Sequence, residues 1–129
     1  MSDTDIVADA SAILALLLGE RFDNLDPMRL LGSSISAVNL CEVLTKLISG
    51  GLAEDEAEAA VSRLDLRVVP FDRPQAQSAA RLWQQTRQSG LSLGDRACIA
   101  LALQIGRPAV TADRIWGNLD IGANVVLIR

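Results

Sequence analysis

The segment Ile6-Val7-Ala8-Asp9-Ala10-Ser11-Ala12 joins a short apolar run, an acidic residue and the beginning of a helical pattern. A short apolar run bounded in this way is typical of a buried strand. The same alternation of short strands and longer helices continues along the chain. Because strands and helices alternate, the sequence predicts a parallel sheet covered by helices on both faces.

We expect an α/β fold, a three-layer α/β/α sandwich with a central, mostly parallel sheet of about five strands. The predicted strands cover residues 5–8, 33–36, 66–70, 108–111 and 124–128. The predicted helices lie near residues 11–19, 22–31, 37–49, 53–64, 73–89 and 95–105, with a short one near 114–119. No linker or repeat interrupts this pattern, so we expect one domain over residues 1–129.

The composition excludes several classes of catalytic site. The chain contains no histidine, so Ser-His-Asp and Cys-His catalysis, histidine-based ribonuclease chemistry and His-ligated zinc are excluded. The formal net charge of −4 is unfavourable for binding nucleic acid, but it fits a carboxylate site that is neutralised by a metal ion. Every basic residue except Lys46 is an arginine, which suits bidentate phosphate contacts. Aromatic residues are scarce, so we do not expect base stacking to dominate recognition of a nucleic acid.

The sequence favours a soluble, cytoplasmic protein. The first five residues are acidic and polar after Met1, without the positive charge that opens a secretory signal. The longest apolar run, residues 12–18, is far shorter than the roughly 18 residues that a membrane span requires. Cys41 and Cys98 both lie within helical patterns, and we expect them to be reduced and buried.

Four carboxylates, those of Asp9, Glu42, Asp95 and Asp113, are the candidate functional groups. Taken singly, each aspartate can cap the helix that follows it, and a cap is worth about 1 kcal/mol. Glu42 can pair with Lys46 one helical turn later. Taken together, they have a second interpretation, because Asp9 and Asp113 follow two predicted parallel strands. Ligand sites of open α/β sheets form at that edge, so we expect all four acids to converge there on one cleft.

Four segments of the chain resemble the acidic motifs of PIN-domain proteins. They read IVADASA at residues 6–12, SAVNLCEVL at 36–44, LSLGDRACIALA at 91–102 and VTADRIW at 110–116. The segments occur in the family's order and at its usual distances. The compact length is similar to that of the VapC-like toxins of bacterial toxin–antitoxin pairs.

The resemblance implies an endoribonuclease that depends on Mg²⁺ or Mn²⁺, with Asp9, Glu42, Asp95 and Asp113 as the metal-binding acids. It also implies an RNA substrate, a homodimer and a VapB-like antitoxin that blocks the site. Hard divalent cations prefer oxygen ligands, and a bound cation supplies a hydroxide for attack on phosphorus without any histidine.

Further residues beside the acids are candidates for supporting roles. Ser11 and Thr111, each two residues from an acid, are expected to hold a carboxylate or a water molecule, although Ser11 is equally a helix-start hydroxyl. Arg96 and Arg114 directly follow two of the acids, and they either meet substrate phosphates or are ordinary solvated arginines. Some relatives carry a further acid after the fourth motif. Here the nearby candidates are Asn118 and Asp120, which leaves the ligands of a second metal open.

Three other functions share this fold class or these acids. A receiver-like phosphoacceptor domain needs an aspartate after the third strand and a late lysine; Asp72 fits, but the single lysine is Lys46, on an early helix. A haloacid-dehalogenase-type phosphatase needs a second aspartate two residues after Asp9, where this chain has Ser11. A catalytically inactive PIN scaffold is the third alternative, and the presence of all four acids disfavours it.

Overall fold

The computed structural model describes residues 5–129, and within them five short parallel strands form one sheet in the order β3-β2-β1-β4-β5. The strands are β1 (Val7–Ala8), β2 (Ser34–Ser36), β3 (Arg67–Val69), β4 (Ala109–Thr111) and β5 (Val125–Leu127). The helices are α1 (Ala10–Leu17), α2 (Ala37–Ser49), α3 (Glu54–Ser62), α4 (Arg73–Thr86) and α5 (Leu93–Ile105). Three 3₁₀ turns complete the order: η1 (Pro27–Leu30), η2 (Arg87–Ser89) and η3 (Arg114–Asn118).

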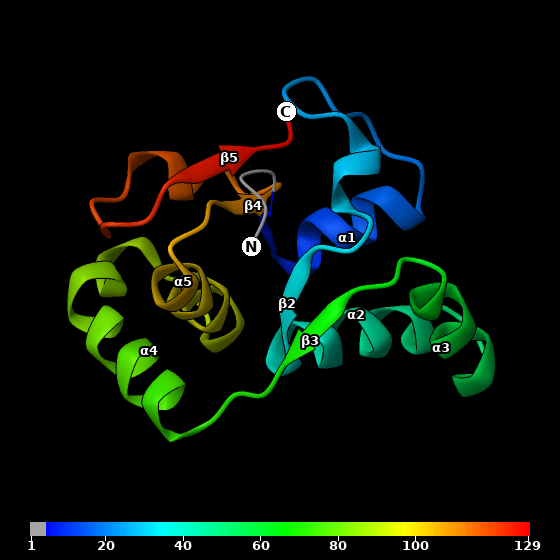
Figure 1. The fold of residues 1–129 in the computed structure, drawn as a ribbon, viewed down its shortest axis with the longest axis horizontal. Coiled ribbons are helices and arrows are strands. Elements are labelled where there is room, and N and C mark those ends of the chain that lie inside the picture. The colour runs from blue at the N-terminus through cyan, green and yellow to red at the C-terminus, as the bar shows by residue number, and fades with distance from the viewer. Residues whose placement is uncertain (1–4) are drawn as a thin grey trace.

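The helices cover both faces of the sheet, which confirms the predicted three-layer sandwich. Helices α1, α2 and α3 lie on one side of the sheet, and α4 and α5 lie on the other (Figure 1). Side chains alternate along the strands: Ala8 and Val110 join the core under α1 to α3, whereas Val7 and Ala109 join the core under α4 and α5. Both layers are aliphatic apart from Trp116, which is fully buried.

Local signals in the sequence explain where the helices begin. The Ser36 hydroxyl accepts a hydrogen bond from the Val38 amide at the start of α2 (3.2 Å), and Asp72 caps α4 in the same way through the Gln75 amide (3.1 Å). Helix α5 begins with a reciprocal pair in which Ser92 and Asp95 each accept a hydrogen bond from the other's backbone amide (3.1 and 2.9 Å). Ser92 is therefore the cap of α5, which begins two residues before the predicted position.

The helix predicted near residues 22–31 is wrong. Only Pro27–Leu30 are helical, as the 3₁₀ turn η1, and Asp26 caps this turn through the Met28 amide (3.0 Å). The preceding residues are held by the far end of the chain, because the Asp23 and Asn24 amides both donate to the carbonyl of Ile128 (2.7 and 3.2 Å). Asp26, which precedes Pro27, is extended (φ −65°, ψ 121°), because the proline ring disfavours helical backbone in the residue before it, so no helix runs through this position. The other predicted helices are present, although residues 87–89 and 114–118 form 3₁₀ turns.

Both cysteines were expected to be buried, and the structure confirms this for one of them. Cys98 is buried as predicted, but Cys41 is exposed, because α2 turns residues 39, 43 and 47 inward and leaves position 41 on its outer side. Among the described residues, no helix combines the length and the apolar character needed to cross a membrane.

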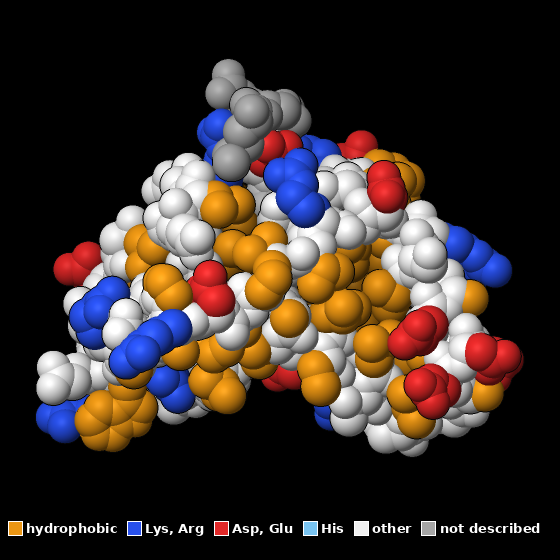
Figure 2. Space-filling view, turned by 60° about the horizontal axis from the view of Figure 1, so that its bottom comes forward, with side chains coloured by type: hydrophobic (Ala, Val, Ile, Leu, Met, Phe, Trp, Pro, Cys, Tyr) orange, Lys and Arg blue, Asp and Glu red, His pale blue; other side chains and the backbone are white. Residues whose placement is uncertain are grey.

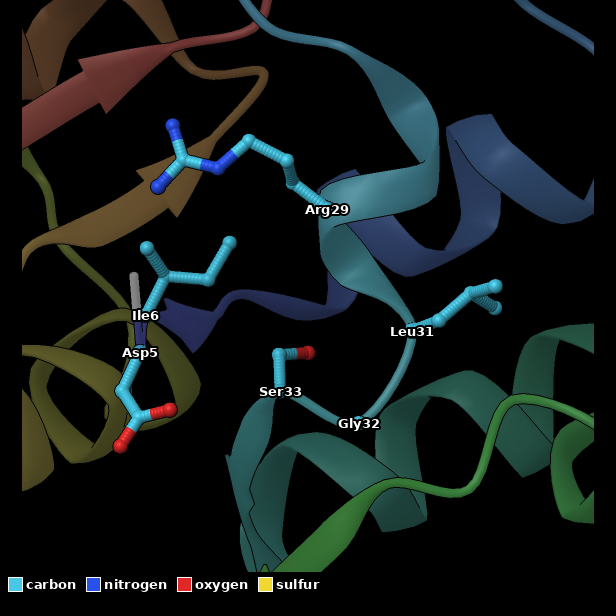
Figure 3. A pocket seen from close by; sticks show the side chains of 6 residues that line it. All are labelled: Asp5, Ile6, Arg29, Leu31, Gly32 and Ser33. Atoms are coloured by element: carbon cyan, nitrogen blue, oxygen red, sulfur yellow. The ribbon is translucent and has the colours of Figure 1, made fainter. Parts of the chain in front are cut away.

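A pocket of about 190 Å³ lies at the edge of the sheet where β1 and β2 begin (Figure 3). It is lined by Asp5, Ile6, Arg29, Leu31, Gly32 and Ser33. The Arg29 side chain extends from η1 over Ile6, whereas the Asp5 carboxylate extends in another direction (Figure 3). None of the four candidate acids lines this pocket, so it is separate from them.

Candidate active site

Asp9 lies at the carboxyl end of the central strand β1 and is 4% exposed. Although it occupies the position before α1, its side chain does not cap that helix. Its Oδ2 instead accepts hydrogen bonds from the hydroxyls of Ser11 (2.7 Å) and Thr111 (2.9 Å). Strand β4, which ends at Thr111, is the parallel neighbour of β1, and this pairing brings together residues that are 102 positions apart in the sequence.

The two hydroxyls have little freedom to turn away from Asp9. The Ser11 oxygen accepts a hydrogen bond from the Ala112 amide (3.0 Å), and the Thr111 oxygen accepts one from the Asp113 amide (3.1 Å). Each hydroxyl thus receives a backbone N–H and has its own proton left to donate to the carboxylate. From the sequence, Ser11 and Thr111 are expected to hold a carboxylate or a water molecule, and in the structure both donate to Asp9.

Glu42 lies half-buried on α2 and reaches the first turn of α5. Its Oε1 accepts a hydrogen bond from the side-chain amide of Asn39 (2.9 Å), and the same amide donates to the carbonyl of Gly94 (2.9 Å). A Cβ atom at Gly94 would overlap the Glu42 carboxylate, so that carboxylate occupies the space left by the missing side chain. Glu42 therefore lies directly beside the residue that precedes Asp95.

Asp95 and Arg96 are both partly buried at the start of α5. The Asp95 carboxylate accepts from the Ser92 amide, which fixes it at the first turn of the helix. Arg96 is turned toward α4, where its Nη1 donates to the Ala79 carbonyl (2.9 Å). The structure thus places Asp95 near Glu42, whereas the Arg96 side chain is engaged in the packing of α4 against α5.

Asp113 is placed differently from the other three acids. Its Oδ1 accepts a hydrogen bond from the Ile115 amide (3.0 Å), so it caps η3 as the ordinary interpretation predicted. Its connection to the Asp9 network runs through its backbone amide and Thr111. Arg114 is exposed, and its Nε donates to the carbonyl of Arg129 (3.4 Å). Asn118 and Asp120, the candidates for a further ligand, are also exposed or nearly so.

The electrostatics of Asp9 show which acids lie close enough to interact. Burial and, to a smaller extent, the charges of Asp95 and Glu42 raise the pKa of the Asp9 carboxyl from 3.8 to about 6. The hydrogen bonds from Ser11 and Thr111 oppose this shift. Burial also raises the pKa of the Cys98 thiol well above its usual value, and Asp9, Asp95 and Glu42 all add to that shift. The charges of three of the four predicted acids therefore act on the Cys98 thiol, and Asp113 is not among these groups.

The oxygen-rich donors of this region fit a hard divalent cation. Within residues 5–129, no three acidic or cysteine side chains stand close enough together to hold a metal ion directly as they are arranged. Mg²⁺, however, keeps several waters and takes only one or two carboxylates directly. A cation beside Asp9 would offset both the burial of its charge and the smaller repulsion from Asp95 and Glu42, which together raise its pKa.

Asn39 is the residue of this region that the sequence analysis missed. It is fully buried, in line with Val43 and Leu47 on the inner side of α2. The signal in the sequence was a polar residue at a position whose neighbours one and two turns later are apolar. Its partner Gly94 lies 55 residues away, so no local pattern indicated the contact.

Comparison with known proteins places this fold in a family. The family model described as the PIN domain matches residues 6–122, whereas the comparison with curated proteins finds no match. Among solved structures, VapBC2 from Rickettsia felis, bound to a DNA fragment from their promoter, is similar with a TM-score of 0.73 at 12% identity, over 96% of this chain and 98% of that one. VapBC-5 from Mycobacterium tuberculosis, a member of the VapBC family of toxin–antitoxin systems, has a TM-score of 0.63 at 24% identity over 98% of each chain.

A third similar structure is VapC20 from Mycobacterium tuberculosis, a toxin that cleaves the sarcin-ricin loop. It has a TM-score of 0.66 at 20% identity, over 92% of this chain and 99% of that one. At these identities the solved structures show a shared fold. The family model covers most of the chain, and the chain therefore belongs to the PIN domain family.

Proposed function

We propose that this protein is an endoribonuclease that depends on Mg²⁺ or Mn²⁺ and acts as the toxin of a toxin–antitoxin pair. The observation that supports this most directly is the cluster of Asp9, Glu42 and Asp95. They come from three different segments of the chain. The charges of Glu42 and Asp95 act on Asp9, and the charges of all three act on the buried Cys98. The similarity to a toxin that cleaves the sarcin-ricin loop supports RNA as the substrate.

The residues that would hold the cation are Asp9, Glu42 and Asp95, directly or through water. Such a cation would lower the pKa of a water molecule and so supply a hydroxide for attack on phosphorus. Ser11 and Thr111 keep the Asp9 carboxylate oriented, with one oxygen occupied by the two hydroxyls. Because the attacking group is water and not the neighbouring 2′-hydroxyl, cleavage is expected to leave 5′-phosphate and 3′-hydroxyl ends.

Asp113 and Arg114 have less direct roles in this proposal. Asp113 completes the metal set by a change of rotamer or through a bound water, since its carboxylate caps η3 in this structure. Arg114 is exposed and is available to a substrate phosphate. Arg96 is assigned to holding α4 against α5 instead of to the substrate.

The proposed antitoxin partner has a suitable surface on the layer of α1, α2 and α3. A hollow of about 480 Å³ lies between these helices and is lined by Leu14, Leu17, Leu18, Lys46, Leu47, Gly50, Leu52 and Ala60. Leu18, 64% exposed, extends this apolar surface at the rim of the hollow, and a contiguous exposed apolar surface is typical of a site that a partner covers. Figure 2 shows hydrophobic side chains exposed across the middle of one face of the molecule. We also propose a homodimer, as the resemblance implies, and a cytoplasmic location, as the sequence favours.

Two of the alternative functions are excluded and one is left to experiment. Membership of the PIN domain family excludes the receiver and the phosphatase. The residues relevant to those two functions have other roles here. Asp72 and Lys46, considered for the receiver, cap α4 and line the apolar hollow, and Ser11, at the position of the phosphatase's second aspartate, donates to Asp9. The inactive scaffold makes a different prediction from the nuclease, namely that the protein cleaves no RNA under any metal condition.

The deciding experiment is incubation of the purified protein with total RNA in Mn²⁺, in Mg²⁺ and in EDTA, followed by sequencing of the new ends. We expect cleavage with either cation, none in EDTA, and 5′-phosphate ends. Asp9→Asn is expected to abolish cleavage, whereas the matched control Asp72→Asn, at an exposed helix cap, keeps it. Cleavage in EDTA, or 2′,3′-cyclic phosphate products, would contradict the mechanism. Absence of cleavage by the wild type would support the inactive scaffold.

A further inference from the structure

We propose that Asn39 is a positioning residue that fixes the Glu42 carboxylate relative to Asp95 and thereby sets the affinity of the site for its cation. This inference rests on the proposed function, because it assigns a role to Asn39 through two of the proposed metal-binding acids. It concerns a residue outside the four acidic positions.

The contacts of Asn39 join the two helices that carry these acids. Its Nδ2 has two protons, and the structure uses both: one is donated to Glu42 Oε1 and one to the Gly94 carbonyl, each at 2.9 Å. Asn39 and Glu42 lie on α2, and Gly94 directly precedes Asp95 on α5. One side-chain amide therefore connects the Glu42 carboxylate to the backbone beside Asp95.

The orientation of this amide is determined by its surroundings. Its two neighbours, a carboxylate oxygen and a carbonyl oxygen, are both acceptors, so the amide nitrogen must face them. The Oδ1 atom then points to a buried position where, among the described residues, it has no hydrogen-bond partner. An unpaired buried oxygen lowers stability, whereas a leucine at position 39 would continue the apolar row of Val43 and Leu47 without that penalty. Packing alone therefore does not account for an asparagine at this position, but the two donated hydrogen bonds do.

The Glu42 carboxylate is confined from a second side by Gly94. Because a Cβ atom at Gly94 would overlap the carboxylate, this position accommodates only a glycine while Glu42 keeps its place. Asp95 is itself fixed by the Ser92 amide. With both carboxylates held, the separation of Glu42 and Asp95 is set before any cation binds. Removing the Asn39 donors frees only the Glu42 side of this arrangement.

The test compares Asn39→Leu with a matched control, Asn24→Leu. Asn24 also donates its side-chain amide to a backbone carbonyl, that of Leu127 (3.0 Å), but it is exposed and belongs to none of the contacts of the acids. Mn²⁺ binding is measured by titration calorimetry in the absence of RNA, and stability is measured by denaturant unfolding in EDTA. Initial cleavage rates are measured over a range of Mn²⁺ and RNA concentrations.

We expect Asn39→Leu to bind Mn²⁺ on the order of 10- to 100-fold more weakly, as is typical when a residue that orients a metal ligand is lost. The concentration of Mn²⁺ at half-maximal rate should rise by a similar factor, and the KM for RNA should stay the same. Stability in EDTA should stay close to that of the wild type, because the loss of the unpaired Oδ1 offsets the loss of the two donated hydrogen bonds. The Asn24→Leu control should bind Mn²⁺ as the wild type does. A purely structural role for Asn39 predicts lower stability with unchanged Mn²⁺ affinity, and that result would overturn the inference.

A second variant approaches the same carboxylate from its other side. Gly94→Ala leaves Asn39 intact but displaces Glu42, so it should weaken Mn²⁺ binding in the same way. If Asn39→Leu does not fold, Asn39→Ala and Gly94→Ala decide the question, and wild-type Mn²⁺ affinity in both would refute the positioning role. Failure of the wild type to bind Mn²⁺ or to cleave RNA is a different result, which would refute the proposed function itself.

Discussion

Asp9→Asn is expected to stabilise the metal-free protein while it abolishes cleavage. The Asp9 carboxylate is almost fully buried and lies near Glu42 and Asp95, so its pKa in the folded state is about 6 instead of 3.8. At about 1.4 kcal/mol for each pH unit, this difference corresponds to roughly 3 kcal/mol by which the ionised carboxylate destabilises the fold at neutral pH. Asparagine removes the charge, and its oxygen can still accept from Ser11 and Thr111. Its Nδ2 needs a new acceptor, so we expect a net gain of about 1–2 kcal/mol.

The stability gained by Asp9→Asn should depend on pH, and the direction of that dependence follows from the raised pKa of Asp9. A carboxyl whose folded pKa is raised binds more protons in the folded state, so it lowers stability progressively as the pH rises from the unfolded value of 3.8 to the folded value of about 6. Below pH 3.8 both states are protonated and the variant has no electrostatic advantage. The advantage of Asp9→Asn should therefore grow between about pH 4 and pH 6 and level off above pH 7.

The measurement is denaturant and thermal unfolding of both proteins in EDTA from pH 4 to pH 8. For a chain of this size, 1–2 kcal/mol corresponds to a rise in Tm of about 4–8 °C. The control Asp72→Asn, at an exposed cap where asparagine serves nearly as well, should stay within about 0.5 kcal/mol of the wild type at every pH. A stability difference between Asp9→Asn and the wild type that is constant from pH 4 to pH 8, or a less stable variant at pH 7, would refute the reasoning.

Three further predictions concern the proposed metal site and the apolar hollow beside α1, α2 and α3. Adding Mg²⁺ should raise the Tm of the wild type by mass action and that of Asp9→Asn much less, as thermal melts with and without the cation can show; equal shifts would place the cation elsewhere. Ser11→Ala removes a hydrogen bond that lowers the pKa of Asp9, so the acidic limb of the pH–rate profile should move to higher pH, and the Ala112 amide loses its acceptor at a cost of about 1–3 kcal/mol in unfolding free energy. Leu18→Glu, on the rim of the apolar hollow, should prevent co-purification of the co-expressed antitoxin while RNA cleavage continues at the wild-type rate; retained binding would place the partner on another surface.

The confirmed parts of the fold prediction rest on patterns that are local in the sequence. Short apolar runs such as residues 108–111, followed by helical periodicity, are sufficient to predict a parallel sheet covered by helices on both faces, because each element carries its own buried side. The predicted strands each contain an observed strand within one or two residues of their ends. The helix predicted near residues 22–31 is absent because Asp26, before Pro27, is extended, while the Asp23 and Asn24 amides bond to Ile128, more than 100 residues away.

The candidate acids could be selected from the sequence, but their arrangement could not. The strand-end positions of Asp9 and Asp113 predicted one edge of the sheet for both, and the absence of histidine restricted the chemistry to carboxylates and a metal. The structure then separates the acids: Asp9, Glu42 and Asp95 interact through their charges, whereas the Asp113 carboxylate caps η3. Both interpretations of Asp113 were open at the level of sequence, because a cap and a metal ligand require the same residue at the same position.

What the sequence determined by itself is the class of fold and the kind of functional group, since both depend on residue type and on spacing along one segment. What only the tertiary structure decided is which groups meet. Thr111 reaches Asp9 because β4 pairs with β1, and Asn39 reaches Gly94 because α2 packs beside α5. A hydrogen bond forms only between groups about 3 Å apart. Which groups come that close is decided by the tertiary fold and not by their spacing along the chain.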